Sequence, residues 1–304
     1  MHRILTLFIL GLLTALALHA EHAPKIIGYL PDYRLAENAF ANVSKCSDVV
    51  YFGSEIAEDG SIKMADSNPK DLKKLQETCS KHHVDLHLCL GGWKKDTHYA
   101  KVCADPKLRA KVIESLKALQ KKYHFKGVDY DWEYPRTDSE MAGFILLCKE
   151  THEQMGKAFL VTAAFHPGHD IPKGLADQLD RIHLMTYDLA NPHCSIDHSR
   201  AAIKKWTARG IARDKLCIGI ASYALNENDR SKVKTYQQLL QEHGKAVHTT
   251  MPVGGFFGDN QQSAFQKIKL AQTEKLGGVI IWELGQSPAG KDSILHKFPV
   301  RNQQ

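Results

Sequence analysis

The chain has 304 residues, of which 43% are hydrophobic and 24% charged; these proportions provide for a sizeable core and exclude a disordered chain. Its formal net charge of +6 comes from basic residues spread along the sequence, with no basic stripe that carries interleaved aromatic residues. The charge pattern therefore excludes a nucleic-acid-binding protein, and we expect no nucleic acid partner.

The N-terminus has the three-part pattern of a secretory signal peptide. A basic start with Arg3 is followed by an apolar run at residues 4–18 and by small residues such as Ala20. A membrane anchor helix is the alternative interpretation, and no later run reaches the roughly 18 apolar residues that a membrane span needs. We expect residues 1–20 to be removed and residues 21–304 to be secreted, to the extracellular space or a bacterial periplasm, with no membrane contact afterwards.

Short runs rich in β-branched residues alternate with amphipathic helical patterns along the rest of the chain. The predicted strands are 25–30, 48–52, 84–90, 127–133, 159–165, 182–188, 216–223 and 278–282. Helical patterns lie between most of them, including 71–82, 106–123, 138–155 and 199–209. Eight strands alternating with helices predict a single-domain closed parallel barrel, the (β/α)8 or TIM barrel. An open doubly wound sheet is the alternative, but no glycine-rich phosphate loop follows the first strand.

The seven cysteines have no CxxC spacing, so we expect no zinc site. Export would permit disulfides, but the odd number leaves at least one thiol free or paired with another molecule. Cys89, Cys148 and Cys217 lie in apolar runs and are predicted to be buried thiols.

The fourth predicted strand carries three acids at alternate positions. Because side chains alternate along a strand, Asp129, Asp131 and Glu133 share one face, and the intervening apolar residues share the other. The apolar face must meet the surrounding helices, so the acids are predicted to point into the barrel. Glu133 lies at the C-terminal end of the strand, where barrel active sites open.

Three inward carboxylates repel one another away from bulk water, so at least one pKa should rise. A proton shared among them would keep Glu133 protonated near neutral pH and able to act as a catalytic acid. A solvated edge strand and a divalent-metal site are the alternative interpretations of these acids.

Four segments, in order and at the ends of predicted strands, resemble motifs of the family 18 glycoside hydrolases, the chitinase family. Residues 127–135, GVDYDWEYP, resemble its long catalytic motif. Residues 90–93, LGGW, resemble its Ser-x-Gly-Gly segment, and residues 185–188, MTYD, its Met-x-Tyr-Asp segment. Residues 281–283, IWE, resemble the segment with its last-strand tryptophan.

The resemblance implies a role for each matching residue. Glu133 would protonate the glycosidic oxygen, while Asp131 would orient the substrate acetamido group as that group attacks its own anomeric carbon. Asp129, the deepest of the three acids, is expected from the strand pattern, and not from the resemblance, to take part in sharing a proton with them. Tyr187 would hydrogen-bond the acetamido carbonyl, and Asp188 would support the site beside it.

The resemblance also implies residues that contact the sugar. Trp282 would form the apolar floor under the distorted sugar, with Met185 and Tyr29 lining the same pocket. Trp93 would stack on a sugar beyond the scissile bond, although a packed loop anchor is an equal alternative for it. Tyr223, near the end of the seventh strand, is expected to add a sugar contact.

The chain departs from the family pattern at three places. Lys126 replaces the usual aspartate but lies off the acid face, near the closed end of its strand. Cys89 replaces a serine, and its thiol is a weaker hydrogen-bond partner than a hydroxyl, which puts the tuning of Asp129 in doubt. His87, on the same face, is a candidate replacement partner, but an inward histidine is more often a core residue whose hydrogen bonds are satisfied by its neighbours. Residues 221–225, ASYAL, replace a segment that often contacts sugar in the family.

The connection between Tyr223 and Gly277 is predicted to hold two helices and a loop around residues 253–255, without the sizeable α+β insertion that some family members carry between strands seven and eight. We therefore expect an open, shallow groove. The resemblance implies a secreted, monomeric, retaining chitinase that binds chitin or N-acetylglucosamine oligosaccharides and needs no cofactor or metal. The alternatives are a catalytically silent chitin-binding lectin and an endo-β-N-acetylglucosaminidase that cuts N-glycan cores.

Overall fold

The computed structural model describes residues 23–35, 38–65 and 69–298, so the predicted signal peptide lies outside the described residues. Within this part, eight parallel strands pair in the order β1-β12-β8-β7-β6-β5-β4-β2, and pairing of β1 with β2 closes the barrel. The barrel strands are β1 (Lys25–Pro31), β2 (Asp48–Ile56), β4 (Asp85–Gly91), β5 (Gly127–Asp131), β6 (Leu160–Phe165), β7 (Arg181–Leu184), β8 (Leu216–Ala221) and β12 (Gly278–Trp282). The predicted barrel is confirmed.

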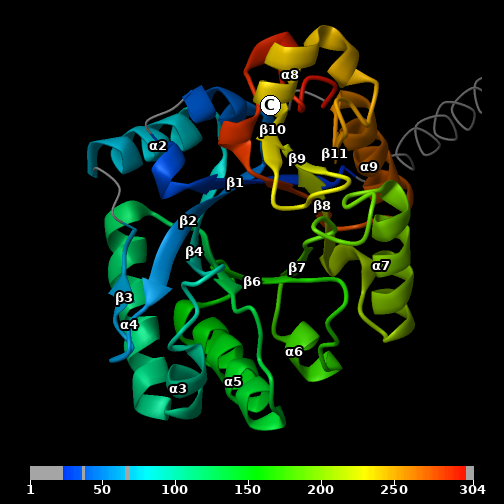
Figure 1. Ribbon diagram of the computed structural model, residues 1–304. Helices are drawn as coiled ribbons and strands as arrows, with labels where there is room; N and C mark the ends of the chain where they lie inside the picture. Colours follow the sequence, from blue (N-terminus) through cyan, green and yellow to red (C-terminus); the bar gives the residue numbers. More distant parts are fainter. Residues whose placement is uncertain (1–22, 36–37, 66–68, 299–304) are drawn as a thin grey trace, which may run out of the picture.

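Helices surround the ring of strands, as Figure 1 shows in a view along the barrel. They are α2 (Pro69–Lys81), α3 (Tyr99–Ala104), α4 (Pro106–Tyr123), α5 (Asp138–Met155), α6 (Lys173–Asp177), α7 (Ile196–Ala208), α8 (Tyr236–His243) and α9 (Gln261–Thr273). Short 3-10 turns are η1 (Asp32–Arg34), η2 (Asn38–Lys45), η3 (Arg213–Lys215), η4 (Gly244–His248), η5 (Leu284–Gln286) and η6 (Gly290–Asp292). The short strand β3 (Ile62–Lys63) pairs antiparallel with the end of β2.

The helix that follows β5 begins at a signal present in the sequence. Thr137 accepts a hydrogen bond from the Glu140 N–H through its hydroxyl, and the Glu140 carboxylate accepts one from the Thr137 N–H. This capping box satisfies main-chain donors that the first turn would leave unpaired. It fixes where α5 starts and thus the length of the loop that carries Glu133.

Side chains of β5 divide between two cores as the alternation predicted. Tyr130 points outward, where its hydroxyl hydrogen-bonds the Thr151 hydroxyl of α5 at 2.8 Å. Trp132 points the same way and stacks on Tyr99 of α3, with ring centroids 5.2 Å apart. Asp129 and Asp131 point inward and are buried.

Three predicted strands end earlier than the sequence indicated, and one of them is β8, which ends at Ala221 and not at Tyr223. β5 ends at Asp131 and β7 at Leu184, so Glu133 and the segment 185–188 lie on loops at the barrel mouth. The reason is local hydrogen bonding: the Glu133 N–H donates to Asp96 at 3.1 Å, and the Thr186 N–H donates to the Leu184 carbonyl of its own chain segment.

The long connection after β8 contains α8 and α9, as predicted, but also a small antiparallel sheet that was missed. This sheet consists of β9 (Tyr223–Asn226), β10 (Val233–Thr235) and β11 (Phe256–Gly258), with β9 in the middle. Figure 1 shows it in yellow beside the barrel. Strands of three or four residues are too short for an alternating pattern to reveal them.

Candidate active site

A cavity of about 410 Å³ opens at the C-terminal ends of the barrel strands. We call it the active-site cavity, and its lining residues are Tyr29, Phe52, Trp93, Asp131, Glu133, Tyr134, Ala164, His166, Met185, Tyr187, Asp188 and Trp282. Eight of the ten predicted site residues are in this lining. A larger cavity of about 770 Å³, near the starts of β4 and β5, includes none of them and is lined by Lys126, which confirms the placement of that residue away from the acids.

Asp129 lies deepest of the three acids and is fully buried. It accepts hydrogen bonds from the Thr162 hydroxyl at 2.5 Å and the Tyr29 hydroxyl at 2.7 Å, and His183 Nδ1 lies 3.1 Å from its Oδ1. Burial alone would raise the pKa of Asp129, but His183, Thr162 and Tyr29 lower it below its usual value. Asp129 is therefore a fixed anion beneath the active-site cavity.

Asp131 sits above that anion without comparable support. Its Oδ1 is buried and has no hydrogen-bond partner among the described residues. Burial, followed by repulsion from Glu133 and Asp129, holds the pKa of Asp131 well above its usual range. The predicted rise in at least one pKa is thus found, and protonation relieves the cost of this buried carboxylate.

Glu133 lies at the mouth of the barrel. Burial, together with the carboxylates of Asp96 and Asp188, raises the pKa of Glu133 to about 7. A carboxyl group with this pKa is protonated in slightly acidic solution and loses its proton near neutrality, as a general acid requires.

Gly91 and Gly92 let the chain pass close to Asp131. Both have positive φ, of 98° and 88°. A Cβ at Gly91 would lie 2.2 Å from the Asp131 carbonyl oxygen, and one at Gly92 would lie 2.4 Å from the Phe52 ring. The positive φ angles and the lack of space for a Cβ both exclude larger side chains at these two positions. This explains the glycine pair in residues 90–93.

The backbone of Asp188 lies in the left-handed region, with φ of 57°, and hydrogen bonds with three other residues hold it there. Tyr223 donates its hydroxyl to Asp188 Oδ1 at 2.7 Å, and Arg230 donates to the Asp188 carbonyl at 2.9 Å. The Asp188 N–H donates to His193 Nδ1 at 3.2 Å, so that nitrogen carries no proton. These bonds present Asp188 to the active-site cavity beside Tyr187.

His193 is buried, and we expect it to make the fold sensitive to acid. Burial lowers the pKa of His193 from 6.5 to about 4, although Asp188 opposes the shift. The unfolded chain therefore binds a proton here at higher pH than the folded chain, so stability falls as pH drops from about 6.5 to about 4, by up to ~3 kcal/mol. Urea unfolding over this range should show a smaller decline for His193→Asn than for the wild type; an equal decline would contradict the assignment.

The apolar part of the active-site cavity is built from aromatic rings. Trp282 packs edge-on against Phe52, with centroids 4.9 Å apart, and at a tilt against Tyr29 at 5.7 Å. Trp93 lies on the rim with 74% of its surface exposed, so the alternative of a packed loop anchor was wrong. The side chains of Met185 and Tyr187 complete the wall.

Two sequence-based assignments need correction. Tyr223 is buried and does not line the active-site cavity; its hydroxyl is used to hold Asp188. His87 is not the replacement partner near Cys89, because its Nε2 contacts Asp48 at 3.0 Å, near the closed end of the barrel. The extra partner of Asp129 is His183 on β7, which the sequence analysis missed.

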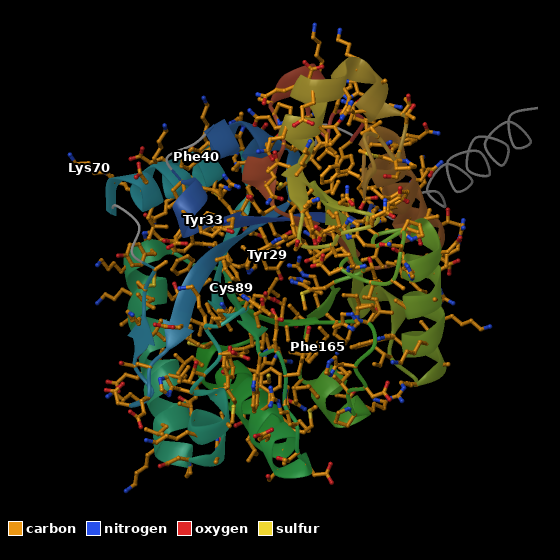
Figure 2. All side chains as sticks on the ribbon, in the orientation of Figure 1. Tyr29, Tyr33, Phe40, Lys70, Cys89 and Phe165 are labelled. Atoms are coloured by element: carbon orange, nitrogen blue, oxygen red, sulfur yellow. The ribbon has the colours of Figure 1, made fainter. Side chains whose placement is uncertain are left out.

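The cysteine predictions agree with the structure. All seven cysteines lie in the described part of the chain, and each is a buried free thiol. Cys89 pairs in register with Asp129 inside the barrel, and burial raises its pKa well above the usual value. Figure 2 labels Cys89 near Tyr29, toward the centre of the ring of strands.

Several further site residues were missed because each is isolated in the sequence. By strand alternation, inward positions are occupied by Thr162 on β6, His183 on β7 and His166 just after β6. A single polar residue in an apolar run carries no specific signal of function. Phe52, within β2, and Tyr134, in the loop after β5, also line the cavity. Strand parity could have placed Thr162 and His183 inside the barrel, but not against Asp129.

Comparison with known proteins identifies related sequences. The sequence model described as "Glycosyl hydrolases family 18" matches residues 25–287. An endochitinase of Manduca sexta is 26% identical over 267 residues, which cover 72% of this chain and 48% of that protein. A class V chitinase of Arabidopsis thaliana is 23% identical over 291 residues, covering 75% of this chain and 77% of that one. The chain thus spans about half the length of the Manduca relative.

Solved structures share the fold at low sequence identity. A chitinase from Bacteroides thetaiotaomicron matches with a TM-score of 0.80 and 20% identity, covering 92% of this chain and 98% of that one. A mutant of a family 18 chitinase from Cycas revoluta, in complex with (GlcNAc)4, matches with a TM-score of 0.74 and 20% identity, covering 90% and 98%.

Proposed function

Because the chain belongs to family 18 of the glycosyl hydrolases, we propose that it hydrolyses the β-1,4 linkages of chitin and chito-oligosaccharides with retention of configuration. The observation that carries this proposal is the Glu133 carboxyl group, which lines the active-site cavity with a pKa raised to about 7. The related endochitinase and class V chitinase support chitin as the substrate.

In the proposed reaction, Glu133 gives its proton to the glycosidic oxygen as the bond to the leaving sugar breaks. The acetamido oxygen of the retained sugar attacks the anomeric carbon and forms a cyclic oxazolinium ion. Water, deprotonated by Glu133, then opens this ring. Two inversions at the same carbon give the retained configuration.

The residues around Glu133 suit this route. Asp131, whose pKa is raised well above its usual range, holds a proton that can be donated to or shared with the acetamido group. Tyr187 lines the same cavity and offers a hydroxyl to the acetamido carbonyl. Asp188 also lines the cavity, but its Oδ1 is engaged by Tyr223, which favours a supporting role over that of nucleophile.

We also propose that the protein is exported, on the pattern of residues 1–20. Among the helices that the structure describes, none has both the length and the apolar character to cross a membrane.

Activity should decline as pH rises through about 7. Glu133 acts only when protonated, and burial and the neighbouring carboxylates set its pKa to about 7. Above that value, kcat/KM for a chito-oligosaccharide should fall about tenfold for each further pH unit, because the protonated fraction falls by that factor. A profile that stays flat from pH 6 to pH 9 would remove Glu133 as the acid.

Hydrolysis should not depend on a divalent metal. Purified protein, dialysed exhaustively against a chelator, is expected to cleave chitotetraose at its full rate, because Glu133 and the acetamido group supply the acid and the nucleophile. Loss of activity on chelation, with recovery on adding Mg²⁺ or Ca²⁺, would favour a metal site built from the acids. Binding without cleavage under either condition would favour the lectin alternative.

A further inference from the structure

His166 belongs to the active-site cavity but to none of the motif segments that carry the family resemblance. It is the first residue after β6 and lines the cavity together with Glu133, Tyr134 and Asp188. The proposed proton transfers and the attack of the acetamido group make no use of it. A residue that lines the cavity without taking part in the reaction can still contact the bound sugar.

One hydrogen bond to the His166 ring indicates which ring nitrogen carries the proton. Nδ1 accepts the Gly168 N–H at 3.0 Å, and therefore carries no proton. The proton of the neutral ring must then be on Nε2. Within the part of the chain that the structure describes, no protein acceptor is paired with this Nε2–H.

The surroundings of His166 keep the ring neutral. Burial, followed by repulsion from His169 and from Lys205 of α7, lowers the pKa of His166 below 6.5, although Asp188 opposes the shift. At neutral pH the side chain is thus an uncharged N–H donor.

The loop that carries His166 is held in place from two sides. Lys205 donates to the Gly168 carbonyl at 2.6 Å, and Trp206 donates to the Pro167 carbonyl at 3.2 Å. On the other side, the His169 ring stacks on Tyr134 with centroids 3.8 Å apart and planes 27° apart. The donor is therefore positioned before a ligand arrives, which reduces the entropy lost on binding.

His166 would add a neutral donor to those already assigned to the reaction, which are Glu133, Asp131 and Tyr187. The Tyr29 hydroxyl, which also lines the cavity, is already donated to Asp129. A chito-oligosaccharide presents hydroxyl, ring and acetamido oxygens, all of which are acceptors. We propose that His166 donates its Nε2–H to an oxygen of the bound oligosaccharide and is a binding residue of the active-site cavity.

This proposal rests on the proposed function and is tested by binding rather than by hydrolysis. In a Glu133→Gln background, chitotetraose would be titrated calorimetrically into three proteins: the parent, one with His166→Phe, and one with His166→Gln. We expect His166→Phe to weaken binding about three- to tenfold, the loss of one neutral hydrogen bond. We expect His166→Gln, whose side-chain amide can donate from a similar distance, to bind within about twofold of the parent.

The matched control is His296→Phe in the same background, which replaces an exposed histidine that lies outside the cavity lining and outside the His166 loop. Its affinity should equal that of the parent. Unchanged binding by His166→Phe would overturn the proposal, and an equal loss in His166→Phe and His166→Gln would assign His166 to loop structure instead. A parent protein that binds no chitotetraose would contradict the proposed substrate and not the role of His166 alone.

Discussion

Replacing Glu133 with glutamine is expected to lower the turnover of chito-oligosaccharides by at least ~10²–10⁴-fold, the contribution of a positioned proton donor. Glutamine has nearly the same shape as protonated glutamic acid but cannot give up a proton to the glycosidic oxygen. Because the substitution also removes a carboxyl group crowded by Asp131, Asp96 and Asp188, it should not destabilise the fold. Initial rates of chitotetraose cleavage measure the effect.

The control for this experiment is Glu153→Gln on α5, an exposed glutamate on the outer surface whose side chain retains 58% of its accessible area. It should keep wild-type activity. Binding of chitotetraose to Glu133→Gln should survive, since the walls of the active-site cavity are unchanged. Hydrolysis by Glu133→Gln at close to the wild-type rate would show that another group is the acid.

Removal of the acetamido group from the substrate is expected to abolish cleavage. An intramolecular nucleophile can supply an effective concentration of roughly 10⁵–10⁸ M, and a sugar without the group loses all of it. Under conditions in which the wild-type protein consumes chitohexaose, it should therefore form no more product from cellohexaose than the Glu133→Gln variant does. Efficient cleavage of cellohexaose would mean that a protein carboxylate, with Asp188 as the candidate, attacks the anomeric carbon.

A thiazoline analogue of the cyclised sugar provides a second test of the same nucleophile. It resembles the oxazolinium ion, which the site should bind more tightly than it binds substrate. We expect competitive inhibition of chitotetraose hydrolysis. Absence of inhibition at concentrations far above KM would argue against stabilisation of this ion by Asp131 and Tyr187.

Most barrel strands could be predicted from the sequence because they are long enough to show their pattern, whereas β7, with four residues, was predicted as part of a longer run. Runs such as 278–282 are bounded by glycine and helical segments, and β12 (Gly278–Trp282) has the predicted limits. The antiparallel sheet of β9, β10 and β11 was missed because its short strands depend on pairing between segments that are separated in the sequence. Where β7 ends was also missed, because the bonds that draw residues 185–188 out of the sheet depend on neighbouring segments such as β8, whose Gly219 N–H donates to the Thr186 hydroxyl.

Within the site, the acids could be predicted because strand alternation alone places them on one face. The partners of Asp129 could not, since Tyr29, Thr162 and His183 come from three different strands that meet only when the barrel closes in register. Tyr223 was assigned to the sugar because it lies near a strand end, but its hydroxyl is turned to Asp188. Side-chain direction at a strand end depends on the loop that follows, which alternation does not describe.

The central claim is that the acetamido group of the substrate attacks while Glu133 donates the proton, and the configuration of the first product tests it most directly. Purified wild-type protein would be mixed with chitohexaose, and the anomeric protons of the new reducing ends followed by NMR before mutarotation. We predict that the β-anomer appears first and that Glu133→Gln forms neither anomer at a comparable rate. First-formed α-anomer would show a single inversion by water and would contradict this mechanism, even with chitin as the substrate.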